Sequence, residues 1–167
     1  MLGVALMFTG AVLLVNGLAL INKVDSHSVA FFNLIGGLLN VGIAVWAGIT
    51  DNVFGAGQLF LFGFTYLWLA WNALTKQADW RAFGWYCAFV AVMAFPTAAM
   101  TYSDGAPWFG TFWITWGGLW YLFFLMFGLG LSLRRINAFA GATTILIGVG
   151  TAMVPGYLLT SGTWAGG

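Results

Sequence analysis

The sequence predicts an all-α membrane protein of six transmembrane helices. Of its 167 residues, 62% are hydrophobic and only 5% are charged, which leaves too little polar surface to cover a soluble domain. A helix needs about 20 residues to cross a bilayer core of roughly 30 Å. The chain therefore has room for six crossings in a single transmembrane domain, residues 1–167, and for little else.

Six apolar runs define the expected spans, and short polar segments separate them. The runs cover residues 2–21, 28–49, 56–74, 82–102, 108–132 and 136–159. Residues 1–4 lack the basic segment of a removable signal peptide, so we expect the first run to remain as a span. Helix-start signals precede two other runs, because Asp25 or Ser26 and Asp79 can accept hydrogen bonds from free amides there.

The basic residues predict the orientation of the spans. Lys and Arg are retained on the cytoplasmic side of a membrane, whereas Asp has little influence. The second and fourth connections hold only Asp51 and Asp104. All the basic residues lie in or beside the first, third and fifth connections: Lys23, Lys76, Arg81, Arg134 and Arg135. Both termini are therefore expected outside, with the six spans arranged as three hairpins.

Several function classes are excluded by what the spans lack. The chain has no glutamate, and none of its charged residues lies near the middle of a span. One His and one Cys cannot supply the paired ligands of a haem or metal centre, and no catalytic triad is evident. We expect no enzyme activity, no catalytic residue, no metal and no cofactor. The scattered charges also argue against a nucleic-acid partner.

Aromatic and neutral polar side chains occupy the spans instead. Trp113, Trp116 and Trp120 follow an i, i+3, i+7 spacing, and Phe109 lies one turn earlier, so four rings share one helix face. Such faces commonly pack against neighbouring helices or form belts at the two membrane interfaces. A Trp stripe through the depth of a span is less typical of a belt. It suits a path for a flat, neutral solute.

Two motifs are specific enough to indicate a family. They are the run Phe62-Gly63-Phe64-Thr65-Tyr66-Leu67 and the pattern Trp113-x-x-Trp116-Gly117-x-Leu119-Trp120, and weaker matches include Met1-Leu2-Gly3, Asn16-Gly17, Asp79-Trp80-Arg81 and Pro155. Together they resemble the urea channel and short-chain amide transporter family (UreI and AmiS type). The resemblance implies a homo-hexameric ring in the membrane lipid, with one pore in each protomer. The pore-lining residues that it implies, together with Phe109 from the stripe, are Leu2, Leu6, Asn16, Phe62, Thr65, Tyr66, Phe109, Trp113, Trp116, Leu119 and Trp120.

The sequence departs from the family pattern at two places. Acid-activated members carry a long outward loop rich in His and carboxylates, but here the second connection is about ten residues around Asp51 and Asn52, without His. We therefore expect no proton gating from outside. Members of the urea-channel type also place a Glu eight residues before the proline of the sixth span, where this chain has Ile147. This favours an amide-type member or a constitutively open pore.

These observations predict a passive channel for urea and/or short-chain aliphatic amides across the bacterial cytoplasmic (inner) membrane. Ions would lose their water without a compensating charge, so they are excluded. One alternative is an ion-coupled transporter, because Pro96 and Pro155 could break their spans and present carbonyls to an ion. Another is a membrane scaffold that binds a cytoplasmic urease or amidase through the Lys76 to Arg81 connection.

Overall fold

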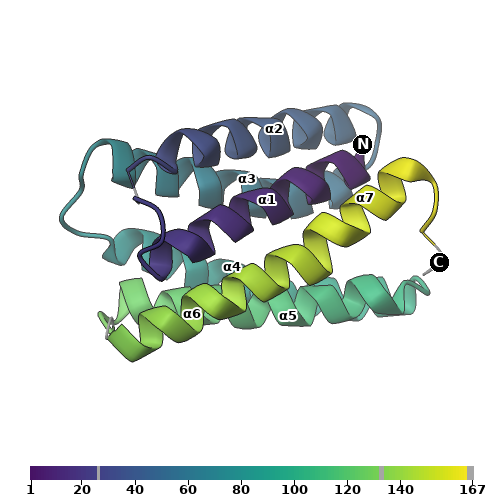
Figure 1. Ribbon diagram of the computed structural model, residues 1–167. Helices are drawn as coiled ribbons and strands as arrows, with labels where there is room; N and C mark the ends of the chain where they lie inside the picture. The colour runs from purple at the N-terminus through teal and green to yellow at the C-terminus, as the bar shows by residue number, and fades with distance from the viewer. Residues whose placement is uncertain (26, 132–133, 165–167) are drawn as a thin grey trace.

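The computed structural model describes residues 1–25, 27–131 and 134–164, which fold as a bundle of helices with no strand (Figure 1). The elements are α1 (Leu2–Leu20), α2 (Ala30–Ile49), α3 (Val53–Leu74), α4 (Arg81–Ser103), α5 (Pro107–Phe123), η1 (Phe124–Gly128), α6 (Arg134–Ile147), η2 (Gly148–Met153) and α7 (Val154–Ser161). The short π-helical segment η1 extends α5, and η2 joins α6 to α7. Six helices in the described residues are therefore long and apolar enough to cross a membrane, which confirms the expected number.

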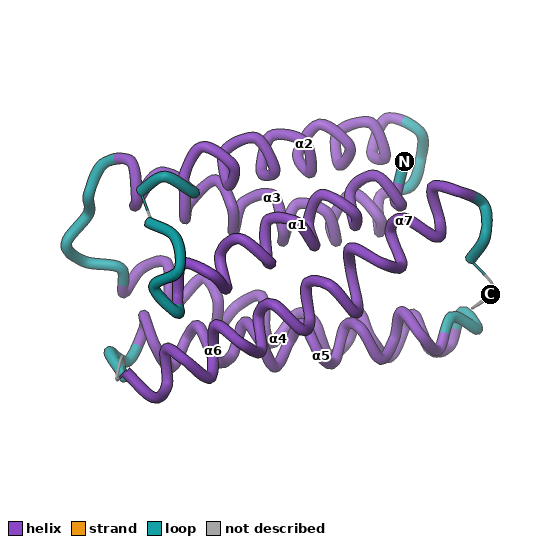
Figure 2. The backbone as a smooth tube through the Cα atoms, in the orientation of Figure 1, coloured by secondary structure: helices purple, strands orange, loops and turns teal. Residues whose placement is uncertain are grey.

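The two chain ends lie at the same end of the bundle (Figures 1 and 2). We call this the outer end, following the orientation predicted from the basic residues, and the opposite end the inner end. The most extensive packing joins α2 to α3, α4 to α5, and α1 to the last span. Each predicted hairpin thus closes at the inner end, while its helices pack most closely against helices of neighbouring hairpins.

Some boundaries differ from the sequence expectation. Helix α3 begins at Val53, three residues earlier than expected, because the side chain of Asn52 accepts a 3.0 Å hydrogen bond from the Gly55 amide. The connection before it is residues 50–52 and is shorter than the expected ten. The fifth span ends at Gly128 and not at residue 132, since η1 closes it with a wide turn.

Of the expected helix-start signals, Asp79 bonds to the first residue of its helix and Asp25 bonds within the preceding turn. The carboxylate of Asp79 accepts a 2.9 Å hydrogen bond from the amide of Arg81, the first residue of α4. Asp25 accepts a 2.7 Å bond from the amide of Ser28, which lies in the turn before α2. Asp25 therefore shapes the connection and not the helix start itself, and Ser26 lies outside the described residues.

Glycines let α1 approach the last span at backbone distance. A Cβ placed on Gly10 would overlap the backbone nitrogen of Met153, so no larger residue fits there. Three facing pairs mark this seam: Gly3 with Gly156, Gly10 with Gly148, and Gly17 with Gly141. The spacing is seven residues throughout α1, but eight residues separate Gly148 from Gly156. The additional residue lies within η2, as expected of a π-helical bulge.

Buried amides hold α1 against α2. Asn16 and Asn33 donate to each other through their side-chain amides, at 2.8 and 2.7 Å. Two helical turns further along α2, the side-chain amide of Asn40 donates to the hydroxyl of Thr9 at 3.2 Å. These contacts satisfy polar groups that lipid could not satisfy, and they place two neutral polar sites on the inward face of α1.

Candidate pore

Two cavities enter the bundle from opposite ends. The inner cavity has a volume of about 490 Å³ and opens beside Asp79 and Arg81. The outer cavity has a volume of about 260 Å³ and opens beside Asn52 and Asp104. Phe62 and Trp116 line both cavities, so the two meet at these rings. We call this ring pair the waist.

Helix α5 places its three Trp rings around one Phe ring of α3. The ring centroid of Phe62 lies 5.8 Å from that of Trp113, 5.1 Å from that of Trp116 and 4.7 Å from that of Trp120. The rings of Phe62 and Trp116 stand edge to face at 88°, a favoured arrangement for aromatic pairs. The i, i+3, i+7 spacing therefore makes one continuous aromatic wall through the waist.

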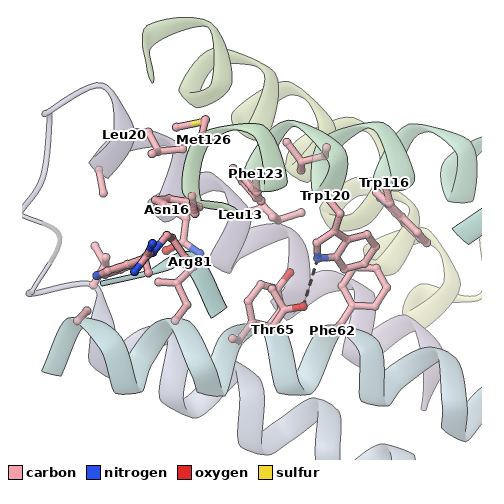
Figure 3. Close-up of a pocket in the computed structure, with 18 of the residues that line it drawn as sticks. Leu13, Asn16, Leu20, Phe62, Thr65, Arg81, Trp116, Trp120, Phe123 and Met126 are labelled. Atoms are coloured by element: carbon pink, nitrogen blue, oxygen red, sulfur yellow. Dashed lines mark hydrogen bonds between the residues drawn. The ribbon is translucent and has the colours of Figure 1, made fainter. Parts of the chain in front are cut away.

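Threonine hydroxyls hold two of the three indoles. The indole nitrogen of Trp120 donates to the hydroxyl oxygen of Thr65 at 3.2 Å (Figure 3), and that of Trp116 donates to Thr151 at 2.7 Å. Each threonine in turn donates its own proton to a carbonyl one turn earlier in its helix. Both indole N–H groups are thus satisfied within the protein, and both rings offer their faces to the cavities.

Tyr66 supplies an unsatisfied polar group beside the waist. Its side chain is only 2% exposed and lines the inner cavity. By distance and angle its hydroxyl has no hydrogen-bond partner in the described part of the chain, although the side chain of Thr9 lies close to it. A buried hydroxyl without a partner carries a desolvation cost. It is therefore placed to exchange a hydrogen bond with a solute in the cavity.

All eleven residues expected to line the pore lie on one of the two cavities. The inner cavity contains Asn16, Phe62, Thr65, Tyr66, Trp116, Leu119 and Trp120. The outer cavity contains Leu2, Leu6, Phe62, Phe109, Trp113 and Trp116. In Figure 3, Asn16 projects from α1 across the inner cavity from the aromatic residues of α5.

The sequence interpretation missed several lining residues, some of which had a visible signal. Thr9, Leu13 and Leu20 also line the cavities, and they continue the three- and four-residue spacing of Leu2, Leu6 and Asn16 along α1. That heptad-like spacing could have found them. Asn40, Gln58, Phe123 and Met126 belong to faces of other helices that no periodicity distinguished. Pro96 is exposed on the side of α4 and lines neither cavity.

Charged side chains occur only at the two mouths of this path, among the described lining residues. At the inner mouth, the guanidinium of Arg81 contacts the carboxylate of Asp79 at 2.6 Å, with both side chains exposed to solvent. Hydrogen bonds from Arg81 lower the pKa of Asp79 to about 2. The pair therefore keeps both charges at ordinary pH, while Asp104 is the charged residue of the outer mouth.

A six-helix bundle with two aromatic-lined cavities that enter from opposite ends and meet inside is the architecture of a membrane transport protein. The family model of the AmiS/UreI family transporter matches residues 1–163. The chain belongs to this family, and it is a multi-pass protein of the bacterial inner membrane.

Relatives of known name fall into two groups. A Mycolicibacterium smegmatis protein named for the transport of amidate substrates is 37% identical, over 99% of this chain and 79% of its own length. The acid-activated urea channel of Helicobacter pylori strain J99 is 33% identical, over 98% of this chain and all of its own length. The crystal structure of the urea channel from Helicobacter pylori superimposes with a TM-score of 0.87 at 30% identity, covering 99% of this chain and all of that one.

Proposed function

We propose that this protein is a passive channel for urea and short-chain aliphatic amides and that it has no acid gate. One observation carries the proposal: cavities from both ends of the bundle share Phe62 and Trp116. A solute that moves from one cavity to the other past these two rings crosses the whole bundle without meeting a buried charge. Both groups of relatives, amide transporters and urea channels, support this class of permeant.

The waist favours flat, neutral molecules. The walls around it are aromatic and aliphatic side chains, and the indole donors of Trp116 and Trp120 are already bonded to threonines. An ion entering this region would lose its hydration without gaining a counter-charge, which costs many kcal/mol. A urea or amide molecule loses fewer hydrogen bonds and regains dispersion contacts with the rings. The Tyr66 hydroxyl adds one hydrogen bond at the waist.

The outer connections support the absence of an acid gate. The α2 to α3 connection is only residues 50–52, with Asp51 as its one charged residue. The single histidine of the chain, His27, lies in the α1 to α2 connection at the opposite end. The alignment with the Helicobacter pylori channel has 198 positions, against 167 residues in this chain. At least 31 of its positions therefore lack a counterpart here, which is consistent with a missing loop.

The assembly that we propose is a homo-hexameric ring with one pore in each protomer. The family resemblance implies it, and large apolar side chains cover the sides of the bundle, among them Phe31, Leu38, Trp71, Phe89 and Leu146. Some of these side chains would contact lipid and others a neighbouring copy. The two cavities lie within one protomer and share the rings of Phe62 and Trp116, which supports one pore in each protomer.

Stopped-flow light scattering of proteoliposomes tests the proposal. Vesicles are mixed with gradients of urea or of acetamide at about pH 5 and about pH 7.5, with empty vesicles as the control. The channel predicts fast, non-saturating uptake that is unaffected by an uncoupler and equal at both pH values. Uptake that needs a proton or sodium gradient would favour the coupled transporter, and acid-dependent uptake would contradict the ungated pore.

A further inference from the structure

Thr151 lies outside the set of residues that the family motifs indicate, yet it contacts Trp116, one of the two rings of the waist. Its hydroxyl oxygen accepts the 2.7 Å hydrogen bond from the indole nitrogen of Trp116. Trp116 is one of the two rings shared by both cavities and is only 3% exposed. The orientation of this ring therefore depends on a side chain from the last span.

The hydroxyl of Thr151 can act toward the indole only as an acceptor. It donates its one proton to the carbonyl of Ile147, also at 2.7 Å. Its lone pairs remain for the indole N–H of Trp116, which makes no other hydrogen bond with the described residues. The bond thus fixes the ring edge-on to Phe62 and withdraws its N–H from any solute.

The π-helical segment η2 sets the position of Thr151. The bulge lies one turn before Pro155, which has no amide proton to donate to the carbonyl of Thr151. The extra residue of this turn is visible in the eight-residue spacing between Gly148 and Gly156 on the seam with α1. A π-helical turn contains one more residue than an α-helical turn, so it changes the direction in which the following side chains point. Without the bulge, residues on its two sides would not face the seam together as they do here.

We propose that Thr151, held by the bulge η2, is a positioning residue that fixes Trp116 at the waist and thereby sets the size limit for permeants. This inference rests on the proposed channel function. Without the bond, the indole rotates away from its edge-on contact with Phe62, and the waist admits bulkier amides. Discrimination between urea and a longer amide such as butyramide then falls by about fivefold, the value expected for one neutral hydrogen bond.

The test compares Thr151→Val with Thr151→Ser and with the matched control Thr144→Val. Valine keeps the shape of Thr151 but cannot accept the indole proton, whereas serine can. Thr144 is fully buried in the same span and donates a 2.7 Å bond to the carbonyl of Ala140, but it accepts no indole proton. The measurement is the ratio of urea to butyramide permeability in proteoliposomes by stopped flow.

Thr151→Val is expected to lower the permeability ratio about fivefold, while Thr151→Ser and Thr144→Val keep the wild-type ratio. An unchanged ratio in Thr151→Val, or an equal fall in Thr144→Val, would overturn the proposal.

The indole N–H signal of Trp116 in ¹⁵N-labelled protein, assigned by its loss in Trp116→Phe, gives a second readout. It should lose its hydrogen-bonded shift only in Thr151→Val. This signal can be measured without transport. If the wild-type protein showed no flux, the channel function would be refuted, while the NMR signal would still test the bond between Thr151 and Trp116.

Discussion

Trp120 and Thr65 join α5 to α3 through a single hydrogen bond, in which the indole nitrogen donates to the hydroxyl oxygen at 3.2 Å beside the inner cavity (Figure 3). Together with the bond from Trp116 to Thr151, it turns two potential hydrogen-bond donors of the path into fixed walls. The Tyr66 hydroxyl remains a buried polar group beside the waist without a partner in the described part of the chain.

Replacing Thr65 by valine removes the acceptor and leaves the Trp120 N–H free in the inner cavity. We expect a small loss of stability, about 1 kcal/mol, because hydrogen bonds between membrane helices contribute modestly. We also expect slower urea flux, because a free donor in the inner cavity stabilises the solute there and not at the waist, which raises the barrier between the two. Thermal unfolding in detergent and stopped-flow uptake measure the two effects. Faster flux would contradict this role of the bond.

Replacing Tyr66 by phenylalanine removes a hydroxyl that has no partner within the described protein. Stability should be unchanged or slightly higher, since an unsatisfied buried polar group is costly. Urea permeability should fall about fivefold, the loss expected when one neutral hydrogen bond to the solute disappears. A clear loss of stability with unchanged flux would show instead that the hydroxyl serves the fold.

The amide pair of Asn16 and Asn33 is expected to behave as a unit. Asn33→Leu leaves the Asn16 amide buried and unpaired, which should cost about 1–3 kcal/mol of stability. Asn16→Leu combined with Asn33→Leu should recover most of that loss, because both polar groups are then gone. A double-mutant cycle on thermal stability measures the coupling. Additive effects of the two single changes would contradict the mutual hydrogen bonds.

The glycine seam predicts a contrast between two glycine positions. Gly10→Ala places a Cβ against the backbone of Met153 and should prevent α1 from packing on η2. Gly42 has nothing within 4 Å of the corresponding position, so Gly42→Ala should be tolerated and serves as the control. Yield of folded protein after size-exclusion chromatography distinguishes them. Equal yields would refute the backbone-distance contact.

The charge at the inner mouth should not respond to mild acid. Because Arg81 lowers the pKa of Asp79 to about 2, the carboxylate loses its charge only as the pH falls through that value. Any stabilisation from the pair is thus present above the ordinary Asp pKa, and so throughout pH 5 to 7.5. Asp79→Asn should therefore give the same pH profile of urea flux as the wild type. An acid-dependent difference between the two would contradict this assignment.

The number of spans and the Trp wall could be predicted from the sequence because both depend on local patterns. Apolar length defines a span, and the spacing of Trp113, Trp116 and Trp120 defines a face. The contact of Thr151 with Trp116 could not be predicted, because the sequence alone does not show that Gly148 and Gly156 both face α1 with the bulge η2 between them. Helix α1 is apolar over most of its surface. The sequence therefore predicts Asn16, but not Thr9, as a polar lining residue of this helix.

Chemical blockage of the outer cavity tests the central claim most directly. Leu2 lines this cavity and is 46% exposed, whereas Val53 lies at the same end, is 72% exposed and lines neither cavity. Each is changed to cysteine after the buried Cys87 has been replaced by alanine, and a membrane-impermeant cationic thiol reagent is added from outside.

Urea flux after complete labelling, confirmed by mass spectrometry, is the quantity to measure. A path through the two cavities predicts that labelled Leu2→Cys falls to the flux of empty vesicles, while labelled Val53→Cys keeps the flux of its unlabelled form. Undiminished flux through fully labelled Leu2→Cys would show that the solute does not pass through the outer cavity and the Phe62–Trp116 waist.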